Sequence, residues 1–471
     1  MAWKNHLTTW GRHFGPGRFI AAEFAVLVGT ICCLAKVQND TWWHLAAGRS
    51  MAETGQVMLT EEFSHTAYGA HWANYEWLSE VVFYQLYQAG GMPLLVAVCA
   101  LSLMGACLLM WTLMQGRIED RLVVAALALA LIAPGWAVRP QAFSLLLLPL
   151  VVHLVLRERF PLLPSVFLLW ANLHGAVALG LVVLAGDLLA ELASGRRRRG
   201  RRVLYGLLSV GATLLTPLGL SYWPEVLRSL QRSQLNRVAE WQPPDLSVQY
   251  AVFWIAAIVF VSLAATGWRR LERPGDRTLV VVASLLLVFA VRSTRNIVPF
   301  ALVAAPAVSR LIWPREVERR AVSLQAGWAG ASARVLAFAL SLVLAAVVIH
   351  HRWAGSPPPA DWTPVSREAA VAIGRCDSPI YNHYNDGGYL IWFVPERKVF
   401  LDSRQDPYPV ELVQAQLRAE RTGEYRTLVD RYAIGCAVLR PDAAAVTALA
   451  STGWRVTYRD ALWVVVEKPG S

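Results

Sequence analysis

The stretch that decides the fold is "FIAAEFAVLVGTICCLAKVQNDTWWHLAAGR", residues 19–49. Its first part, residues 19–38, is an apolar run close to the ~20 residues that a helix needs to cross a membrane. The second part, residues 39–49, brings together an acid, two tryptophans, a histidine and an arginine. Ionisable groups at membrane depth are costly and usually line a cavity or a substrate path. The stretch therefore predicts a membrane protein with a polar site where its first helix emerges.

The composition agrees with a chain that crosses the membrane many times. Of 471 residues, 55% are hydrophobic and 16% are charged, and 20 are tryptophan. A soluble globular protein does not have this balance. The net charge of +11 comes from basic residues in short loops between apolar runs. Such loops are typical of the cytoplasmic face, so we expect no nucleic-acid partner.

The basic loops also give a topology with the N-terminus inside and the C-terminus outside. They lie around Arg12, Arg117, Arg157, Arg196 to Arg202, Arg269 and Arg315. Placing them in the cytoplasm predicts about eleven transmembrane helices. The expected spans are residues 19–38, 92–114, 122–138, 142–156, 162–171, 176–192, 203–217, 248–266, 279–291, 297–312 and 332–350.

Three regions follow from this pattern. Residues 1–352 form an all-α polytopic membrane domain, whose long first outer loop, residues 39–91, carries two amphipathic helices. Residues 353–366 are a Pro-rich linker. Residues 367–471 form a small extracytoplasmic α/β domain, in which short β-rich runs alternate with helical stretches. "SPIYNHY", "RKVFLDS", "IGCAVLR", "WRVTYRD" and "LWVVVEK" are the expected strands.

Cysteine use adds one structural hypothesis. Cys376 and Cys436 both fall in the outer domain, where an oxidising compartment permits a disulfide, although the spacing alone does not test their distance. The remaining cysteines within spans are expected to act as small hydrophobes.

Asp40 is the first candidate for chemistry, because it lies where the first span ends. Its carboxylate either faces a substrate or accepts a hydrogen bond from the amides of the next helical turn, and both roles can coexist. His44 lies one turn later, so Asp40 and His44 can share a divalent metal or form an acid-supported histidine. An interfacial histidine that is hydrogen bonded to its neighbours is an equally good interpretation.

Further acids and arginines fall on the same predicted face. Glu76 and Glu80 repeat the four-residue spacing, and Glu240 precedes Trp241 in a later outer loop. Each of them can supply a second carboxylate. The arginines predicted at outer helix ends are Arg139, Arg292 and Arg295. Three guanidinium groups at one level predict a phosphate or pyrophosphate head group, whereas the alternative is snorkelling to lipid phosphates.

His174 lies in the predicted turn "WANLHG" between two short helices, where it can act as a ligand. Trp42, Trp43 and Trp72 can stack on sugar rings, and membrane anchoring explains these rings equally well. In the outer domain, Asp402, Arg404 and Asp406 follow a predicted strand and suit either a plain turn or acceptor binding. The sequence contains no phosphate-binding loop, dinucleotide fingerprint, zinc-protease motif or hydrolase elbow, which weakens the corresponding enzyme classes.

The motifs "DTWWHLAAGR", "EWLSEVVFYQLYQAGG", "WANLHG", "EWQPPD" and "GGYLIWFVPERKVFLDSRQD" resemble a bacterial group related to the GT-C superfamily of membrane glycosyltransferases. For the wider superfamily the resemblance is architectural: an acid after the first span, a long first outer loop, about eleven spans and a soluble C-terminal domain. It implies a GT-C-like fold in a multi-pass protein of the bacterial inner membrane.

The resemblance also implies an activity, which is inverting transfer of a sugar from a polyprenyl-phosphate carrier to a glycan, lipid or protein acceptor outside. By position, Asp40 is then the general base or a metal ligand, with a divalent cation such as Mg²⁺ or Mn²⁺. The chain departs from the family pattern because His44, not a second acid, follows Asp40. The competing hypothesis is a flippase, transporter or assembly partner for lipid-linked glycans.

Overall fold

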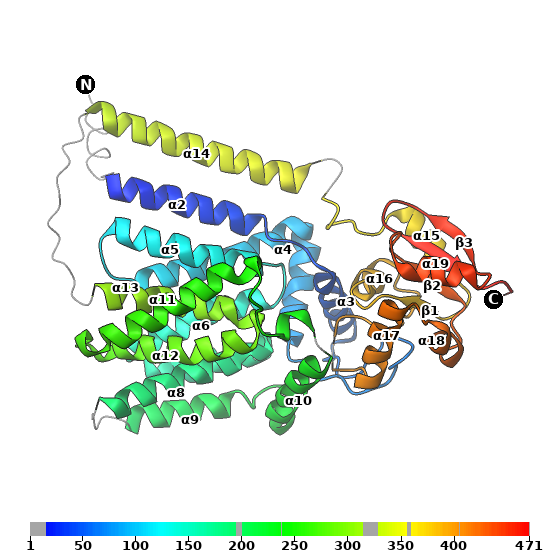
Figure 1. Cartoon of the computed structure of the whole chain (residues 1–471), viewed down its shortest axis with the longest axis horizontal. Helices are drawn as coiled ribbons and strands as arrows, with labels where there is room; N and C mark the ends of the chain where they lie inside the picture. The colour runs from blue at the N-terminus through cyan, green and yellow to red at the C-terminus, as the bar shows by residue number, and fades with distance from the viewer. Residues whose placement is uncertain are drawn as a thin grey trace.

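The computed structural model describes residues 16–194, 200–236, 238–313, 328–355, 359–404 and 406–470. A bundle of long helices fills one side of the molecule, and a smaller domain with a sheet caps one end of the bundle (Figure 1). The basic residues at Arg12, at positions 196–199 and at positions 315–320, and part of the linker at positions 356–358, lie outside the described residues.

The bundle follows the predicted apolar runs, each of which is helical over most of its length. Its helices are α2 (Pro16–Cys33), α4 (Trp77–Leu113), α5 (Ile118–Ile132), α6 (Gln141–Leu156), α7 (Leu163–Leu173), α8 (Ala178–Ala193), α9 (Gly200–Ala212), α11 (Ala251–Gly267), α12 (Pro274–Arg292), α13 (Ile297–Ile312) and α14 (Trp328–Ala354). Short 3₁₀ turns join several of them: η1 (Ala133–Gly135), η2 (Phe160–Leu162), η3 (Gly175–Val177), η4 (Gly219–Ser221), η5 (Ala239–Trp241), η6 (Val248–Tyr250), η7 (Trp268–Arg270) and η8 (Thr294–Asn296).

Six helical segments of the described residues are long and apolar enough to cross a membrane. Helices α6 and α7 are apolar but shorter. The number of about eleven crossings therefore stays a prediction, because length and composition support only part of it.

The first outer loop contains the predicted first amphipathic helix, α3 (Asn39–Thr54). The second amphipathic helix and the following span, which the sequence separated, form one kinked helix, α4. The kink lies at Gly90 and Gly91, where Gly91 has φ 64°. Only glycine adopts this backbone region at little cost, and Pro93 follows as a second helix breaker. The kink turns α4 from the outer loop into the bundle.

Helix α10 (Tyr222–Leu235) was not predicted. It lies where α9 and α11 are connected, beside the C-terminal domain (Figure 1). Tyr222 is fully buried and packs edge to face on Tyr75 with ring centroids 6.0 Å apart. This contact fixes the start of α10 against the first outer loop.

The C-terminal domain is α/β, as predicted. Its strands are β1 (Ile380–Asn382), β2 (Cys436–Leu439), β3 (Arg455–Arg459) and β4 (Val464–Glu467), in the order β1-β2-β4-β3. Strands β1 and β2 are parallel and the other pairs are antiparallel. The helices are α15 (Arg367–Gly374), α16 (Gly387–Phe393), α17 (Val410–Thr422), α18 (Arg426–Arg431) and α19 (Ala444–Ser451).

The strand predicted at "RKVFLDS" is wrong. This segment makes one isolated bridge, between Val399 and Ser64, so it pairs with the first outer loop instead of with the sheet. Val399 and Phe400 are nevertheless fully buried. The β-like composition therefore reflects burial between two parts of the chain.

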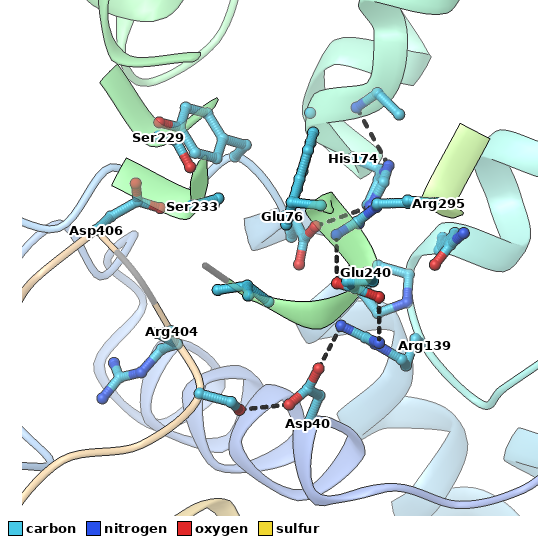
Figure 2. Close-up of a pocket in the computed structure, with 18 of the residues that line it drawn as sticks. Asp40, Glu76, Arg139, His174, Ser229, Ser233, Glu240, Arg295, Arg404 and Asp406 are labelled. Atoms are coloured by element: carbon cyan, nitrogen blue, oxygen red, sulfur yellow. Dashed lines mark hydrogen bonds and ion pairs between the residues drawn. The ribbon is translucent and has the colours of Figure 1, made fainter. Parts of the chain in front are cut away.

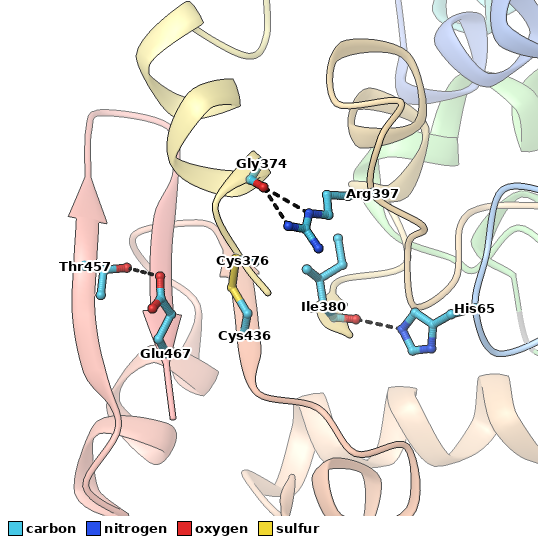
Figure 3. Close-up of a disulfide and its surroundings, with 8 residues drawn as sticks. All are labelled: His65, Gly374, Cys376, Ile380, Arg397, Cys436, Thr457 and Glu467. Carbon is cyan, nitrogen blue, oxygen red and sulfur yellow. Dashed lines mark hydrogen bonds between the residues drawn. A yellow bond between two sulfur atoms is a disulfide. The ribbon is translucent and has the colours of Figure 1, made fainter. Parts of the chain in front are cut away.

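The disulfide that the sequence left open is present. Cys376 and Cys436 are bonded with Cα atoms 6.0 Å apart, and the bond ties the chain before β1 to β2 (Figure 3). Beside it, the Ile380 carbonyl is 2.9 Å from His65 Nε2, so the first outer loop also reaches this part of the domain.

The C-terminal domain touches the membrane domain through α16 and α3. A Cβ atom at Gly388 would lie 2.3 Å from the Asn39 carbonyl oxygen, and one at Gly387 would lie 2.5 Å from that of Leu401. Both distances are shorter than any real contact, so only glycine permits this packing. Gly388 thereby lets the start of α16 lie directly on the start of α3, and Gly387 lets it lie against the segment at Leu401 within the C-terminal domain.

Candidate functional site

A cavity of about 820 Å³ lies at the junction of the bundle and the C-terminal domain. Charged residues of the outer loops line one part of it, including Asp40, Glu76, Arg139, Glu240 and Arg295 (Figure 2). Leu145, Leu179, Val182, Phe289 and Pro299 from α6, α8, α12 and α13 form an apolar part. A third part is formed by α10 and the C-terminal domain.

Asp40 lies in the first turn of α3 but does not cap it. Gln38 and Thr41 form the capping box instead. The Asp40 carboxylate accepts hydrogen bonds from the Ser403 hydroxyl and from Trp43 Nε1, the latter at 3.4 Å, and it forms an ion pair with Arg139. The capping role considered from the sequence is therefore wrong, and the carboxylate points into the cavity.

Arg139 is held by the chain that links α5 to α6. Its neighbour Val138 donates its amide to the Lys36 carbonyl at 3.0 Å and accepts from the Thr41 hydroxyl at 2.6 Å. These bonds tie the segment to both ends of the α2–α3 connection. Arg139 is thereby placed to bind Asp40 on one side, while its Nη1 lies 3.6 Å from Glu240 Oε2.

Glu240 joins the two arginines. Its other oxygen, Oε1, lies 2.8 Å from Arg295 Nη1. The backbone of Glu240 is fixed because its carbonyl accepts from the Ser293 hydroxyl at 2.9 Å and from the Thr294 hydroxyl at 3.1 Å. Coulombic attraction, chiefly from Arg295, lowers the pKa of Glu240, so this acid is ionised at neutral pH.

Arg292 does not join this group. It is exposed at the end of α12 and is not part of the cavity lining, whereas Arg295 follows on η8 and points inward. Ser293, whose backbone is extended at φ −155°, ends α12 and separates the two arginines. Of the three arginines that the sequence grouped, the structure therefore brings two, Arg139 and Arg295, to the cavity.

His174 lies between Glu76 and Arg295, whose Nη2 is 3.4 Å from the His174 Nε2. Its Nδ1 lies 2.8 Å from the Ser144 hydroxyl and 3.2 Å from the Ala176 amide, which donates to it. Trp170 Nε1 donates to Ser144 Oγ at 2.7 Å, so the hydroxyl proton is free to point at His174. Because Nδ1 faces two donors, the network assigns the ring proton to Nε2, which donates to Glu76 Oε1 at 3.1 Å.

Glu76 lies between two histidines. Its Oε2 is 3.3 Å from His44 Nε2, and His44 Nδ1 is 3.0 Å from Glu80 Oε1. Glu80 in turn accepts from Asn74 Nδ2 at 2.7 Å. Polar contacts therefore form one chain from Asp40 through Arg139 and Glu240 to Arg295, and a second chain from His174 through Glu76 and His44 to Glu80.

Burial tunes the protonation of this chain. It raises the pKa of Glu76 to about 7, and it lowers the pKa values of His44 and His174 well below the usual range. Nearby arginines lower both histidine values further. The imidazoles are therefore neutral at pH 7, and Glu76 is able to exchange a proton there. A pKa near the working pH is what a general base or acid requires.

The described residues also include a group that could hold a metal ion, namely His44, Glu76 and Glu80, whose ligand atoms lie within 4.8 Å of one another. One imidazole and two carboxylates suit a divalent cation. The pairing of Asp40 with His44 as metal ligands is not what the structure favours. Asp40 is engaged by Arg139 and Ser403, and the partners of His44 are glutamates.

The predicted aromatic residues separate into two groups. Trp43 and Trp72 line the cavity. Trp42 is 1% exposed and packs on Phe393 with ring centroids 4.7 Å apart, so it belongs to the core. Of the three predicted tryptophans, two remain available to contact a substrate.

Asp402 and Arg404 form an ion pair with each other. Arg404 Nε donates to Asp402 Oδ1 at 2.8 Å, and Arg404 Nη1 lies 2.6 Å from Glu61 Oε2. The Tyr408 hydroxyl donates to Asp402 Oδ2 at 2.7 Å. This buried cluster joins the first outer loop to the C-terminal domain. The turn interpretation therefore explains Asp402. Arg404 belongs to the same cluster and also reaches the cavity.

Sequence reasoning missed Ser403, Ser144 and Tyr384, which support or line the site. Ser403 stands next to residues that were considered, but a lone serine after a strand-like run carries no signal of its own. Ser144 lies within an apolar helix, where a polar residue is a weak pointer to a buried partner.

No model of a known protein family matches the sequence, and no curated protein sequence matches it. Solved structures do. The oligosaccharyltransferase AglB of Archaeoglobus fulgidus, in complex with an inhibitory peptide and a dolichol-phosphate, is 11% identical with a TM-score of 0.57 over 90% of this chain and 69% of that chain. The apo form of the Archaeoglobus fulgidus oligosaccharyltransferase is 11% identical, with a TM-score of 0.57 over 91% of this chain and 70% of that chain. The same enzyme tethered to an acceptor peptide is 11% identical, with a TM-score of 0.55 over 91% of this chain and 69% of that chain.

These similarities show the fold. Over about 90% of its length the chain has the fold of this archaeal oligosaccharyltransferase, which agrees with the architecture that the sequence resemblance implied. Together with the apolar helices of the bundle, this identifies a membrane protein.

Proposed function

We propose that the protein is a membrane glycosyltransferase that moves a sugar from a polyprenyl-phosphate-linked donor to an acceptor on the outer face of the membrane. One observation carries the proposal. Arg139 and Arg295, from separate elements, converge on one carboxylate in a cavity that is apolar toward the bundle and acidic toward Asp40 and Glu76. A lipid-linked phosphate has the matching combination of an apolar chain and an anionic head.

The donor is expected to lie with its phosphate at Arg139 and Arg295. Guanidinium groups bind phosphate oxygens with two parallel hydrogen bonds, and Glu240 holds both groups in place before the donor arrives. The apolar part of the cavity, lined by Leu179 and Val182 among others, then accommodates the first units of the lipid chain. The similar AglB structure holds a dolichol-phosphate, which supports a lipid-linked donor.

The reaction requires a base for the acceptor and cations for the leaving group. A carboxylate takes the proton of the acceptor hydroxyl, the oxygen forms a bond to the anomeric carbon, and the bond from that carbon to the phosphate oxygen breaks. The phosphate leaves with the electron pair, and the arginines stabilise its charge. The sugar is thus transferred with inversion.

Asp40 and Glu76 are the two candidates for the base. Asp40 was the prediction from sequence, and it remains one. The Asp40 carboxylate is already occupied by the ion pair with Arg139 and by hydrogen bonds from Ser403 and Trp43. Glu76 has neutral histidines on both oxygens and a pKa raised to about 7. We therefore propose that Glu76 is the base and that Asp40 orients Arg139.

A divalent cation, if bound, would be held by His44, Glu76 and Glu80, and Glu76 would then serve as a ligand instead of as the base. It would act there as a Lewis acid toward phosphate oxygens. The chain's own residues provide the base, the two cations and the orientation described above. Trp43 and Trp72 are then available to stack on the transferred sugar.

The proposed location follows from the basic loops. We place the protein in a bacterial inner membrane as a multi-pass protein, with the N-terminus in the cytoplasm and the C-terminal domain outside. The cavity then opens on the outer face, in contact with membrane lipids and with a glycan, lipid or protein acceptor.

The test is transfer from radiolabelled polyprenyl-phosphate sugars in membranes that contain wild type, Asp40→Asn or Glu76→Gln, with and without a chelator. We expect wild type to transfer label, Glu76→Gln to lose transfer, and Asp40→Asn to weaken donor binding as well. Loss in Asp40→Asn with unchanged donor binding would return the base role to Asp40. Chelator sensitivity would indicate the metal.

The alternative is a flippase or assembly partner for lipid-linked glycans, which uses the same cavity without bond chemistry. The enzyme is favoured because Glu76, the proposed base, lies in the same cavity as the two cations Arg139 and Arg295. If no donor supports transfer while every variant still binds the carrier, the alternative is correct.

A further inference from the structure

One part of the cavity is not used by the proposed donor or by the base. It is formed by one face of α10, with Val226, Ser229, Leu230 and Ser233 at helical spacing, and by residues of the C-terminal domain. Those residues are Asp406, Val413 and Leu417. We call this the α10 wall.

The polar groups of the α10 wall are hydroxyls and one carboxylate. Asp406 is hydrogen bonded to Ser229, and burial raises the pKa of Asp406 to about 6. Figure 2 shows Ser229, Ser233 and Asp406 grouped together, apart from the cluster of Asp40, Arg139 and Glu240. Between these polar groups, Val226, Val413 and Leu417 offer apolar surface.

The cations of α10 are directed elsewhere. Arg228 forms an ion pair with Glu225, and Arg232 Nη1 donates to the Asp406 carbonyl. Neither arginine is among the cavity-lining residues described by the structure. No guanidinium of α10 therefore lines the described part of this wall, and the charges of Arg232 and Arg404 reach Asp406 from beside it.

Hydroxyls and a carboxylate above small apolar patches match the surface of a sugar ring. The ring hydroxyls donate to Asp406 and exchange hydrogen bonds with the two serines, while the C–H faces pack on valine and leucine. Asp406 also lies near enough to Glu76 for its charge to raise the pKa of that acid.

We infer that the α10 wall is the acceptor site and that the acceptor is a neutral carbohydrate chain, held between α10 and α17 with a free hydroxyl directed at Glu76. This inference rests on the proposed function, because only a transferase has an acceptor. The binding site itself does not depend on it, since the wall would recognise the same ligand in a transporter.

The test measures the binding of two neutral oligosaccharides, maltohexaose and chitohexaose, to the full chain in detergent. Tryptophan fluorescence monitors the binding. A hexa-alanine peptide is the comparison probe. We expect at least one oligosaccharide to bind saturably and the peptide not to bind. The Ser229→Ala/Ser233→Ala double variant and Asp406→Asn should each weaken oligosaccharide binding about tenfold or more, roughly the loss of one or two hydrogen bonds to a charged group.

The matched control is Gln231→Ala/Gln234→Ala, on the exposed part of the same helix. It should leave oligosaccharide binding unchanged. Binding of polyprenyl phosphate, which the inference assigns to another part of the cavity, reports whether each variant is folded. Oligosaccharide binding that survives both wall variants in folded protein overturns the inference, as does saturable binding of the peptide alone.

The two proposals fail in different ways. If the oligosaccharide binds at the α10 wall but no donor sugar is ever transferred to it or to another acceptor, the glycosyltransferase proposal falls and the carbohydrate site stands. If labelled sugar is transferred to a peptide or a lipid and never to a carbohydrate, the carbohydrate site falls and the glycosyltransferase proposal stands.

Discussion

Buried charges occur at both ends of the helical bundle, and the two clusters differ in one respect. At the end away from the C-terminal domain, Arg310 pairs with Asp276 and donates to the Leu113 carbonyl at 2.8 and 3.1 Å. Arg202 similarly lies 2.8 Å from Asp187. These groups pair with one another inside close packing, and none of these residues lines the cavity described here.

At the end beside the C-terminal domain, the same residue types surround about 820 Å³ of open space. Glu240, whose side chain is 36% exposed, links two arginines, and Glu76 links two histidines. The comparison teaches that a buried ion pair is weak evidence of function by itself. Function is indicated where the charges are shared and face a cavity.

The largest expected effect separates chemistry from folding. Replacing Glu76 by Gln keeps the shape but removes the basic oxygen, so sugar transfer should fall by roughly 10²–10⁴-fold, the usual contribution of a general base. Transfer in purified membranes at saturating donor measures this. Glu158→Gln, an exposed acid at the opposite end of the bundle, is the control and should leave transfer unchanged. Equal losses in both variants would contradict the assignment.

The next effect concerns stability at the closed end. Arg310→Ala leaves Asp276 buried without its partner, so the free energy of unfolding should fall by ~3–5 kcal/mol. Denaturant unfolding in detergent measures the change. Arg295→Ala should cost less, because the Glu240 that it leaves behind is partly exposed and still near Arg139. If both arginines contribute equally to stability, the contrast between the two ends is wrong.

A smaller effect is expected from Arg295→Lys. The ammonium keeps the charge but loses the paired hydrogen bonds of the guanidinium, so the donor KM should rise about tenfold while the fold is retained. Steady-state transfer as a function of donor concentration gives KM and kcat separately. A changed kcat with an unchanged KM would place Arg295 outside donor binding.

The smallest effect is in the pH profile. Glu76 acts as a base only when ionised, and its pKa is raised to about 7, so transfer should increase about threefold between pH 6.5 and 7.5. His44 and His174, which contact it, stay neutral over this range because burial lowers their pKa values. A profile that is flat through pH 7 in wild type would remove Glu76 from the rate-limiting proton transfer.

Much of the fold was predictable because apolar runs and helical spacing report local structure directly. Helix α3 begins at Asn39, within the stretch that opened the sequence analysis. Helix α10 was missed because "YWPEVLRSLQRSQL" is short, polar and lies between two expected elements. The segment around Val399 was misjudged because burial against another part of the chain gives the same composition as a strand.

The site was predictable in its residue types but not in its pairings. Asp40, Glu76, Arg139, His174, Glu240 and Arg295 line one cavity as expected from the topology. Arg292 and Arg295 differ by three positions, and an extended residue between them decides which one faces inward. His44 contacts Glu80 across 36 residues of sequence, a pairing that helical spacing from Asp40 could not indicate.

The contact between Ser403 and Asp40 joins residues that are 363 positions apart. A ribosome therefore completes the first acid of the site long before it reaches the hydroxyl that orients it. While the bundle is being inserted, the cavity lacks the surface that the last domain supplies. The cavity is therefore complete only when synthesis is nearly finished, and the proposed transfer could not start before then.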